Sequence, residues 1–442
     1  MDQSSPSEVK HTKTQTWSSN TLNQLAPEDR AIHDWYRFVL SFPPHLVRQY
    51  LEKFAVTAEH CVLDPFAGTG TTLVECQKQG IPSVGIEANP MAYFACKTKL
   101  DWEISAQGLI DHALAIAEQA RQDLAWFPGD SLRHTLTAEG EKVLLRNSIS
   151  PKPLHKALLL REHIEQQPDS RFLAHEKLAL AKAVVGSASN LRFAPEASVV
   201  RAREDAPVID LWLQAIDIMA ADLRTLADAP RGLARVVAGD ARIPQRGLLP
   251  NSVDAVITSP PYPNEKDYTR NTRLESVLLG FIRDRTDLRQ VKEHLLRSNS
   301  RNIYTRDTDD QYIANFPDIL ELAATIDQKR QELGKTSGFS RLYSRVVKLY
   351  FGGMAIHLKE LRPLLRPGAQ LAYVVGEQAS YLGVLIPTGE LLAKIAESLG
   401  YTVTGIDLFR TRRAASTNLA LKEEVVVLQW ADNPHNKEES PT

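Results

Sequence analysis

Cysteine pairs, long apolar runs and a surplus of one charge are all missing from this 442-residue chain. Its 3 cysteines form no Cys-x-x-Cys pair and no zinc-ligand cluster, so neither a disulfide scaffold nor a bound metal is expected. No apolar run reaches the roughly 18 residues of a membrane span, and the first residues lack the apolar segment of a signal peptide. These absences favour a cytoplasmic protein without a membrane partner.

The formal net charge of −2 excludes a protein that binds nucleic acid through its overall charge, so any such surface must be a local patch. Composition and periodicity divide the chain into core segments, insertions and polar ends. We predict a flexible polar arm at 1–28, core segments at 29–105, 235–263 and 345–430, a helical insertion at 106–234, a basic insertion at 264–344 and a flexible tail at 431–442.

The core segments alternate short apolar strands with helices, which is typical of a doubly wound α/β sheet. The first unit is a strand at 61–66, a Gly-rich turn, a helix at 72–79 and a strand at 82–90. Further strands are predicted at 236–243, 253–262 and 368–377, with a helix at 352–368. Two final strands, TVTGIDLFR and EEVVVLQW, are expected to pair antiparallel.

The turn DPFAGTGTT at 64–72 is a candidate ligand site. Gly68 and Gly70 allow a sharp bend and a close approach of ligand to backbone, and the following helix directs free N–H groups at the same space. Asp64, Glu87 and Asp240 each end a predicted strand, and Glu87 is placed to accept hydrogen bonds from a ribose.

The turn lacks the third glycine of a dinucleotide fingerprint and the Lys-Ser/Thr of a P-loop. An acidic rim instead suits a cofactor that carries hydroxyls, an amine and a positive charge. S-adenosylmethionine therefore fits best, although the glycines alone would also fit a simple packing turn.

A second motif, Thr258-Ser259-Pro260-Pro261-Tyr262, follows the strand at 253–262. Two prolines remove two N–H donors, which leaves a rigid array of acceptors on Ser259 and Pro260 beside an aromatic face. Such an array can hold an exocyclic –NH₂ while its ring stacks on Tyr262. A rigid loop with a packing tyrosine is the alternative explanation of this motif alone.

Together and in this order, DPFAGTGTT and TSPPY resemble the S-adenosylmethionine-dependent DNA amino-methyltransferases, which methylate N4 of cytosine or N6 of adenine. The resemblance covers about residues 30–105, 235–268 and 345–430. It implies a mostly parallel, seven-stranded Rossmann-like sheet with an antiparallel C-terminal strand, plus the large helical insertion. It also implies S-adenosylmethionine as cofactor, no metal, and a prokaryotic cytosol or nucleoid location.

The resemblance also assigns site residues. The catalytic candidates are Ser259, Pro260, Pro261 and Tyr262. The cofactor-binding candidates are Phe42, Pro43, Asp64, Phe66, Ala67, Gly68, Gly70, Thr71, Thr72, Glu87, Asn89, Asp240, Ala241 and Ser259.

Ser259 at the first position of the tetrapeptide is more typical of cytosine-N4 enzymes, so we predict methylation of N4 on a cytosine flipped out of duplex DNA. No cysteine follows a proline as in the cytosine-C5 enzymes. N6-adenine methylation, RNA base methylation and a catalytically idle DNA-binding subunit remain alternatives. The family further implies a restriction-modification or related role, with a cognate restriction or defence component as a candidate partner.

Residues 264–306 hold ten basic and six acidic residues, a local excess of positive charge that could contact DNA or be an ordinary solvated face. The DNA-binding candidates are Lys266, Tyr268, Arg270, Arg273, Arg297, Arg301, Arg412 and Arg413. The insertion at 106–234 could recognise the target sequence, clamp the duplex or form an oligomer. Within it, Phe193 could line the cleft or pack in the core.

Overall fold

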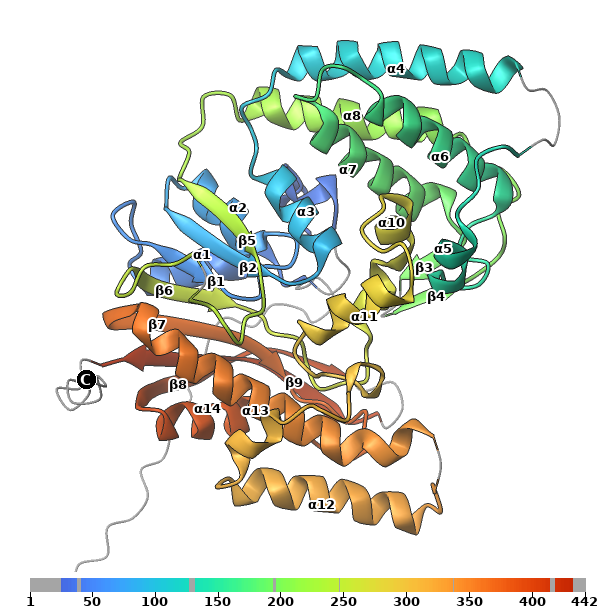
Figure 1. Ribbon diagram of the computed structural model, residues 1–442. Helices are drawn as coiled ribbons and strands as arrows, with labels where there is room; N and C mark the ends of the chain where they lie inside the picture. Colours follow the sequence, from blue (N-terminus) through green and yellow to red (C-terminus); the bar gives the residue numbers. More distant parts are fainter. Residues whose placement is uncertain are drawn as a thin grey trace, which may run out of the picture.

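One seven-stranded sheet organises the protein, in the strand order β5-β2-β1-β6-β7-β9-β8 (Figure 1). The structure is a computed structural model that describes residues 25–37, 41–126, 132–193, 196–245, 247–336, 338–413 and 418–431. The strands are β1 (Val62–Asp64), β2 (Ser83–Glu87), β5 (Ala234–Ala238), β6 (Val253–Thr258), β7 (Leu365–Gly376), β8 (Tyr401–Arg413) and β9 (Ala420–Trp430).

Strands β5, β2, β1, β6 and β7 run parallel, whereas β9 runs antiparallel to both β7 and β8. This confirms the predicted fold class and the antiparallel pair at the end of the chain. From β1 the chain proceeds to one side through β2 and β5, and then returns to the other side through β6 and β7. The order therefore reverses between β1 and β6, which is where ligands bind in sheets of this kind.

Both faces of the sheet are covered by helices, and the side chains of each strand alternate between them. On β7, Ala372 and Val374 join the cluster under α1 (Pro44–Lys53), whereas Leu371 and Tyr373 join the cluster under α13 (Tyr343–Leu361) and α14 (Thr388–Ser398). Strands buried on both faces read as continuous apolar runs, which is why they could be located in the sequence.

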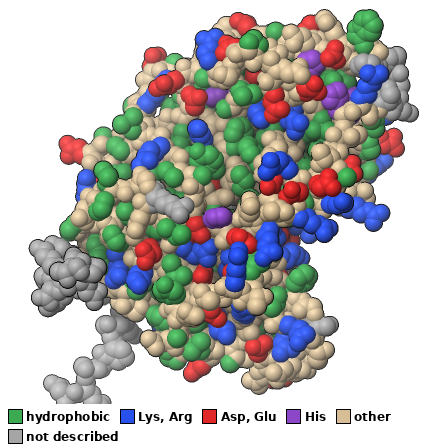
Figure 2. Space-filling model, viewed as in Figure 1, with side chains coloured by type: hydrophobic (Ala, Val, Ile, Leu, Met, Phe, Trp, Pro, Cys, Tyr) green, Lys and Arg blue, Asp and Glu red, His purple; other side chains and the backbone are tan. Residues whose placement is uncertain are grey.

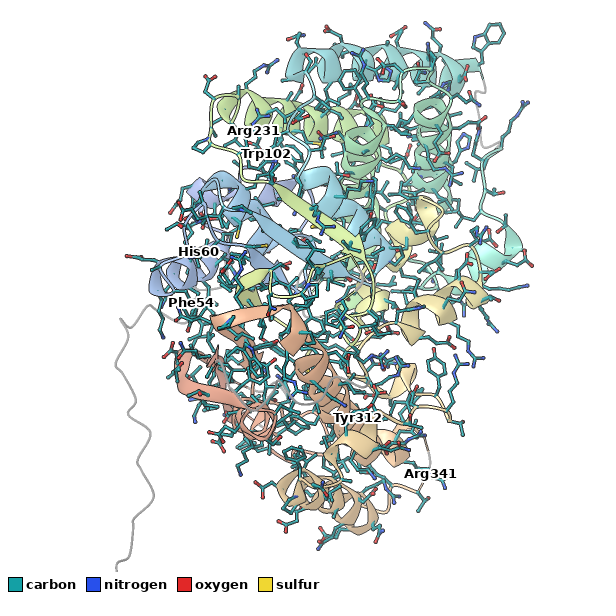
Figure 3. All side chains as sticks on the ribbon, turned by 60° about the vertical axis from the view of Figure 1, so that its left-hand side comes forward. Phe54, His60, Trp102, Arg231, Tyr312 and Arg341 are labelled. Atoms are coloured by element: carbon teal, nitrogen blue, oxygen red, sulfur yellow. The ribbon has the colours of Figure 1, made fainter. Side chains whose placement is uncertain are left out.

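The first insertion forms a helical layer beyond the sheet, at the top of Figure 1. Its helices are α4 (Ala106–Trp126), α5 (Ala138–Val143), α6 (Pro151–Glu165), α7 (Leu173–Ala183) and α8 (Val208–Thr225). Trp102 is buried where α3 (Pro90–Lys99) meets this layer (Figure 3). The segment before α1 is fastened to the layer as well, because Asp222 on α8 accepts a hydrogen bond from the Trp35 indole at 2.8 Å.

The insertion also contains a small hairpin, β3 (Leu191–Phe193) paired with β4 (Ala197–Val199), which was not predicted. Phe193 lies on this hairpin, half-buried, and does not line the large pocket described below. Among the described residues, no helix is both long and apolar enough to cross a lipid bilayer.

The second insertion is also largely helical, with α9 (Tyr268–Asn271), α10 (Arg273–Leu278), α11 (Arg285–Glu293) and α12 (Pro317–Glu332). Helix α13 begins at Tyr343, so the predicted start at residue 352 was wrong. Glycines are poor helix formers and Gly352 and Gly353 therefore resembled a helix boundary. Their actual role is packing, because a Cβ at Gly352 would lie 1.9 Å from the Asp309 carbonyl oxygen.

Candidate active site

A pocket of about 570 Å³ opens at the carboxyl ends of the central parallel strands and is lined by both predicted motifs. Gly68 comes from the turn between β1 and α2 (Thr71–Lys78), and Ser259, Pro260, Pro261 and Tyr262 follow β6. The volume is within the usual range of ligand sites. The two loops, about 190 residues apart in sequence, therefore face one common space, as the strand order requires.

Glu87 is fixed at one end of this pocket by two backbone groups. The N–H of Gly68 donates to its carboxylate at 2.7 Å, and the N–H of Asn89 donates to its other oxygen at 2.7 Å. Burial raises the pKa of Glu87 to about 7. Its carboxylate is therefore an oriented acceptor that stands at the strand end where a ribose was predicted.

Eleven of the predicted cofactor residues line the pocket. They are Phe42, Pro43, Phe66, Ala67, Gly68, Thr71, Glu87, Asn89, Asp240, Ala241 and Ser259. The remaining three, Asp64, Gly70 and Thr72, do not line it, and they brace the turn from behind instead.

Asp64 is fully buried and joins β1 to β6, because its carboxylate accepts the Thr258 hydroxyl at 2.6 Å and the Phe66 N–H at 3.1 Å. Burial raises its pKa to about 6. Thr72 donates to the Ile257 carbonyl at 3.1 Å. Gly70 has a φ of +88°, and a Cβ there would lie 2.7 Å from Cys96 Sγ. These three residues shape the turn and need not touch a ligand.

Asp240 lines the pocket, but its carboxylate is held by Arg242 at 2.7 Å. Arg242 also reaches the second insertion, where it pairs with Asp309 at 2.6 Å and donates to the Glu293 carbonyl at 3.1 Å. The segment after Glu293 continues as a wall of the pocket. Arg242 and this wall could not be predicted from the sequence, since no motif marks a contact between distant segments.

His357 is a second residue that the sequence did not indicate. It is fully buried on α13, with Nδ1 2.7 Å from the Ala241 carbonyl oxygen and Nε2 2.7 Å from the Tyr373 hydroxyl. Burial lowers its pKa to about 4, so the ring is neutral at pH 7. A neutral ring satisfies both contacts when Nδ1–H donates to Ala241 and Nε2 accepts from Tyr373. His357 thereby positions the backbone of the pocket wall.

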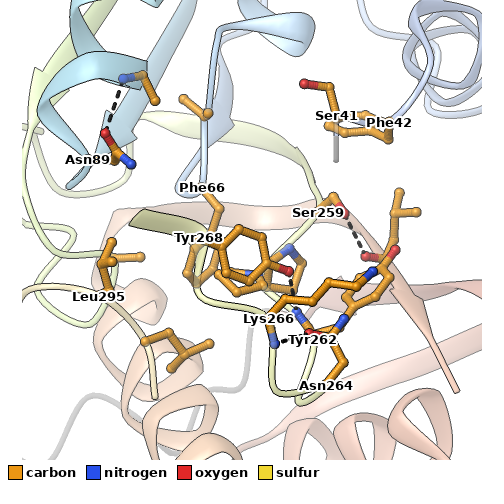
Figure 4. A pocket seen from close by; sticks show the side chains of 18 of the residues that line it. Ser41, Phe42, Phe66, Asn89, Ser259, Tyr262, Asn264, Lys266, Tyr268 and Leu295 are labelled. Atoms are coloured by element: carbon orange, nitrogen blue, oxygen red, sulfur yellow. Dashed lines mark hydrogen bonds between the residues drawn. The ribbon is translucent and has the colours of Figure 1, made fainter. Parts of the chain in front are cut away.

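At the other end of the pocket, the Ser259 hydroxyl donates to the Val374 carbonyl at 3.1 Å (Figure 4). Because the hydroxyl proton of Ser259 is directed into the sheet, its Oγ can still accept a hydrogen bond from a ligand through its lone pairs. The Tyr262 N–H donates to the Tyr268 hydroxyl at 3.0 Å, which closes the loop on itself. Burial, with the charge of Glu423, raises the pKa of the Tyr262 phenol, so the ring stays neutral.

Both insertions hold this candidate catalytic loop (residues 259–268). From the first insertion, Glu196 accepts the Asp267 N–H at 3.1 Å. From the second, Ser300 donates its N–H to the Glu265 carboxylate at 2.9 Å. The loop is therefore fixed by residues that lie far from it in sequence on either side.

The predicted DNA-binding residues separate into two groups. Lys266, Tyr268, Arg412 and Arg413 line the pocket. Arg301 is exposed beside Phe339, whereas Arg270 is half-buried and donates to the Ala197 carbonyl. Figure 2 shows basic side chains, mixed with acidic ones, across the middle of the molecule.

Two of the predicted DNA contacts need correction. Arg273 is 7% exposed and donates to the carbonyls of Thr269 and Val143. Arg297 is 4% exposed and pairs with Asp307 at 2.9 Å. Both guanidinium groups have their partners inside the protein, so they stabilise the fold and do not meet DNA.

The chain is similar to known methyltransferases. Residues 2–96 match a family model of N6/N4 methyltransferases that is described as DNA methylase. The chain is 25% identical over 451 aligned positions to the type II methyltransferase M.BsoBI of Geobacillus stearothermophilus, covering 92% of this chain and 85% of that protein. It is 24% identical to M.AvaI of a Nostoc species, covering 90% and 85%.

A solved structure, TrmN from Thermus thermophilus, aligns with a TM-score of 0.27 and 13% identity, over 91% of this chain and 52% of that one. The chain thus spans about half of that protein. The family match and the type II relatives support an adenine- or cytosine-type N-methyltransferase, in agreement with the predicted resemblance. Along most of its length, it is similar to type II methyltransferases.

Proposed function

We propose that the chain transfers a methyl group from S-adenosylmethionine to N4 of a cytosine flipped out of duplex DNA. One observation carries the proposal: the Gly68 turn with Glu87 and the loop Ser259–Tyr262 line the same pocket. The Gly68 turn and Glu87 suit a methyl donor that carries a nucleoside, and the loop Ser259–Tyr262 suits an exocyclic amine. The similarity to type II methyltransferases supports DNA as the substrate.

The cofactor end of the pocket has the chemistry that S-adenosylmethionine requires. The Glu87 carboxylate can accept the ribose hydroxyls, and Gly68 leaves room for close approach. The Phe66 side chain and Ala241 offer apolar surface for an adenine ring. When bound, S-adenosylmethionine supplies a methyl carbon on a positively charged sulfur, which leaves as a neutral thioether.

At the catalytic end, Ser259 Oγ and the Pro260 carbonyl accept hydrogen bonds from the –NH₂ of the base, and Tyr262 stacks on its ring. These bonds draw the nitrogen lone pair out of the ring and aim it at the methyl carbon. The N–CH₃ bond forms as the S–CH₃ bond breaks, and one amine proton then passes to water. Ser259 positions the amine without acting as a base, since its own proton is bound to Val374.

Cytosine N4 is favoured over adenine N6 because Ser259 occupies the first position of the tetrapeptide. Similarity to type II methyltransferases further favours methylation at a short defined sequence and a cognate restriction enzyme as partner. Flipping the base costs a few kcal/mol, which stacking in the pocket offsets. The exposed basic residues around the pocket mouth would hold the DNA backbone.

Methylation-aware sequencing of DNA from cells that express the chain tests the proposal and reveals base and context together. We expect N4-methylcytosine at one short sequence. Ser259→Ala should lower transfer of tritiated methyl groups about 10²- to 10³-fold while S-adenosylmethionine binding, measured by calorimetry, persists. Ser398→Ala is the matched control, because Ser398 is exposed and also donates to a backbone carbonyl. Unchanged transfer by Ser259→Ala would refute the catalytic assignment.

A further inference from the structure

Lys266 has a fixed backbone and a side chain directed into the pocket. Its N–H donates to the Asn264 side-chain oxygen at 3.2 Å, and its carbonyl accepts from the Asn299 side chain at 3.1 Å. The side chain lines the pocket together with Tyr262, and Figure 4 shows the two side by side. The protein therefore anchors this residue from two directions and leaves its ammonium group in the ligand space.

Within the described part of the chain, the Lys266 ammonium has no hydrogen bond and no ion pair, although neighbouring groups do. Arg410 pairs with Glu423 at 2.5 Å, and Arg412 donates to the Glu377 carbonyl at 2.8 Å. Gln378 donates to the Gly376 carbonyl at 2.9 Å. An unpaired cation in a half-buried site is costly unless a ligand completes it. Burial, reinforced by Arg412, lowers the pKa of Lys266, and the more distant charges of Glu423 and Glu196 offset only part of this decrease.

We propose that Lys266 is a specificity residue whose ammonium group donates to O2 of the flipped cytosine. The inference rests on the proposed function and deepens it. Once Ser259 and Pro260 hold the amine, cytosine presents two further acceptors along the same edge, N3 and then O2. Adenine presents N1 and then a C2–H, which cannot accept. A cation near the O2 position is satisfied by cytosine and left unpaired by adenine, and such a mismatch discriminates strongly.

Burial argues that Lys266 contacts the base and not a phosphate. Phosphate contacts come from side chains that reach out to the duplex, as exposed Arg301 and Arg413 can. Lys266 instead lines the same cavity as Ser259 and Pro260. Its pocket position thus coincides with the space that a flipped base must enter.

The test compares wild type, Lys266→Met and Lys335→Met on duplexes that carry the mapped site. Methionine keeps an unbranched stem as long as the aliphatic part of lysine and removes the ammonium group, and Lys335 is an exposed control outside the pocket. The target position holds either cytosine or 2-thiocytosine, whose sulfur accepts hydrogen bonds only weakly. We expect Lys266→Met to lower kcat/KM on cytosine roughly 10- to 100-fold, as loss of a charged hydrogen bond predicts.

The decisive readout is the dependence on the base. Wild type and Lys335→Met should discriminate against 2-thiocytosine, whereas Lys266→Met should treat both bases alike. The salt dependence of DNA binding should be unchanged in Lys266→Met, since a lost phosphate contact would reduce its slope by about 1.

Retained discrimination in Lys266→Met, an unchanged rate, or a reduced salt slope would each overturn the inference. Methylation of adenine alone by the wild-type enzyme would also overturn the inference. That result would still leave the protein a DNA amino-methyltransferase. Failure of wild type to methylate any DNA would instead refute the proposed function itself.

Discussion

Alanine at Gly70 and alanine at Gly68 should each impair a different property of the protein, although the two glycines are neighbours in one turn. Gly70 has a φ of +88° and a Cβ there would lie 2.7 Å from Cys96 Sγ. Gly68 has a φ of +53°, and a Cβ there would meet nothing closer than the Phe66 carbonyl oxygen at 3.9 Å. Only Gly68 lines the pocket. Gly70→Ala should therefore weaken the fold, and Gly68→Ala should weaken ligand binding.

The magnitudes follow from three contributions. A left-handed conformation costs an L-residue about 1–2 kcal/mol, and crowding a packed interior costs about 1–3 kcal/mol. Reduced freedom of the unfolded chain returns about 0.4–1 kcal/mol. Gly70→Ala carries all three and should lower the free energy of unfolding by about 2–4 kcal/mol. Gly68→Ala lacks the crowding contribution and should lower it by about 1 kcal/mol.

Thermal unfolding and calorimetric titration separate the two effects. Because the unfolding entropy grows with chain length, we expect Gly70→Ala to lower Tm by roughly 2–4 °C and Gly68→Ala by roughly 1 °C in a chain of this size. Below its Tm, Gly70→Ala should bind S-adenosylmethionine nearly as well as wild type. Gly68→Ala should bind at least about tenfold more weakly, because its methyl group occupies ligand space. Equal Tm values for the two variants, or unimpaired binding by Gly68→Ala, would refute this account of the turn.

Two further predictions concern charge. Because burial raises the pKa of Glu87 to about 7, the carboxylate gains a proton and loses an acceptor as pH falls through 7. S-adenosylmethionine affinity should therefore decrease below about pH 7 and be weak but pH-independent in Glu87→Gln; a parallel decrease in both proteins would contradict this. Arg273→Met should lower Tm without changing the salt dependence of DNA binding, since Arg273 is buried. Arg285→Gln, on the exposed helix α11, should leave Tm unchanged and reduce the slope of DNA affinity against salt concentration by about 1. Fluorescence anisotropy over a salt series measures this slope. A reduced slope in Arg273→Met, or an unchanged slope in Arg285→Gln, would contradict these assignments.

The sequence predicted the parts of the site that depend on local pattern. Short apolar runs located β1 and β6, and the carboxyl ends of parallel strands meet at one edge, so Gly68 and Ser259 had to converge. The same rule predicted that Glu87, at the end of β2, lies at this edge of the sheet. No knowledge of side-chain contacts was needed for these conclusions.

The remainder depends on contacts between distant segments, which periodicity does not encode. Arg242 joins Asp240 to Asp309, and His357 supports the backbone of Ala241 across 116 residues of chain. Composition likewise could not distinguish Arg273, which has internal partners, from the exposed arginines of the same basic stretch. The residues that surround a motif are therefore harder to predict than the motif.

The anchoring of the candidate catalytic loop by Glu196 and Ser300 limits how far this protein can be miniaturised. A shortened protein in which a linker replaces residues 106–233 would keep every strand of the seven-stranded sheet and the whole Ser259–Tyr262 tetrapeptide. It would nevertheless lose the carboxylate that holds the Asp267 backbone. Transplanting the motif into another scaffold therefore requires transplanting its distant supports.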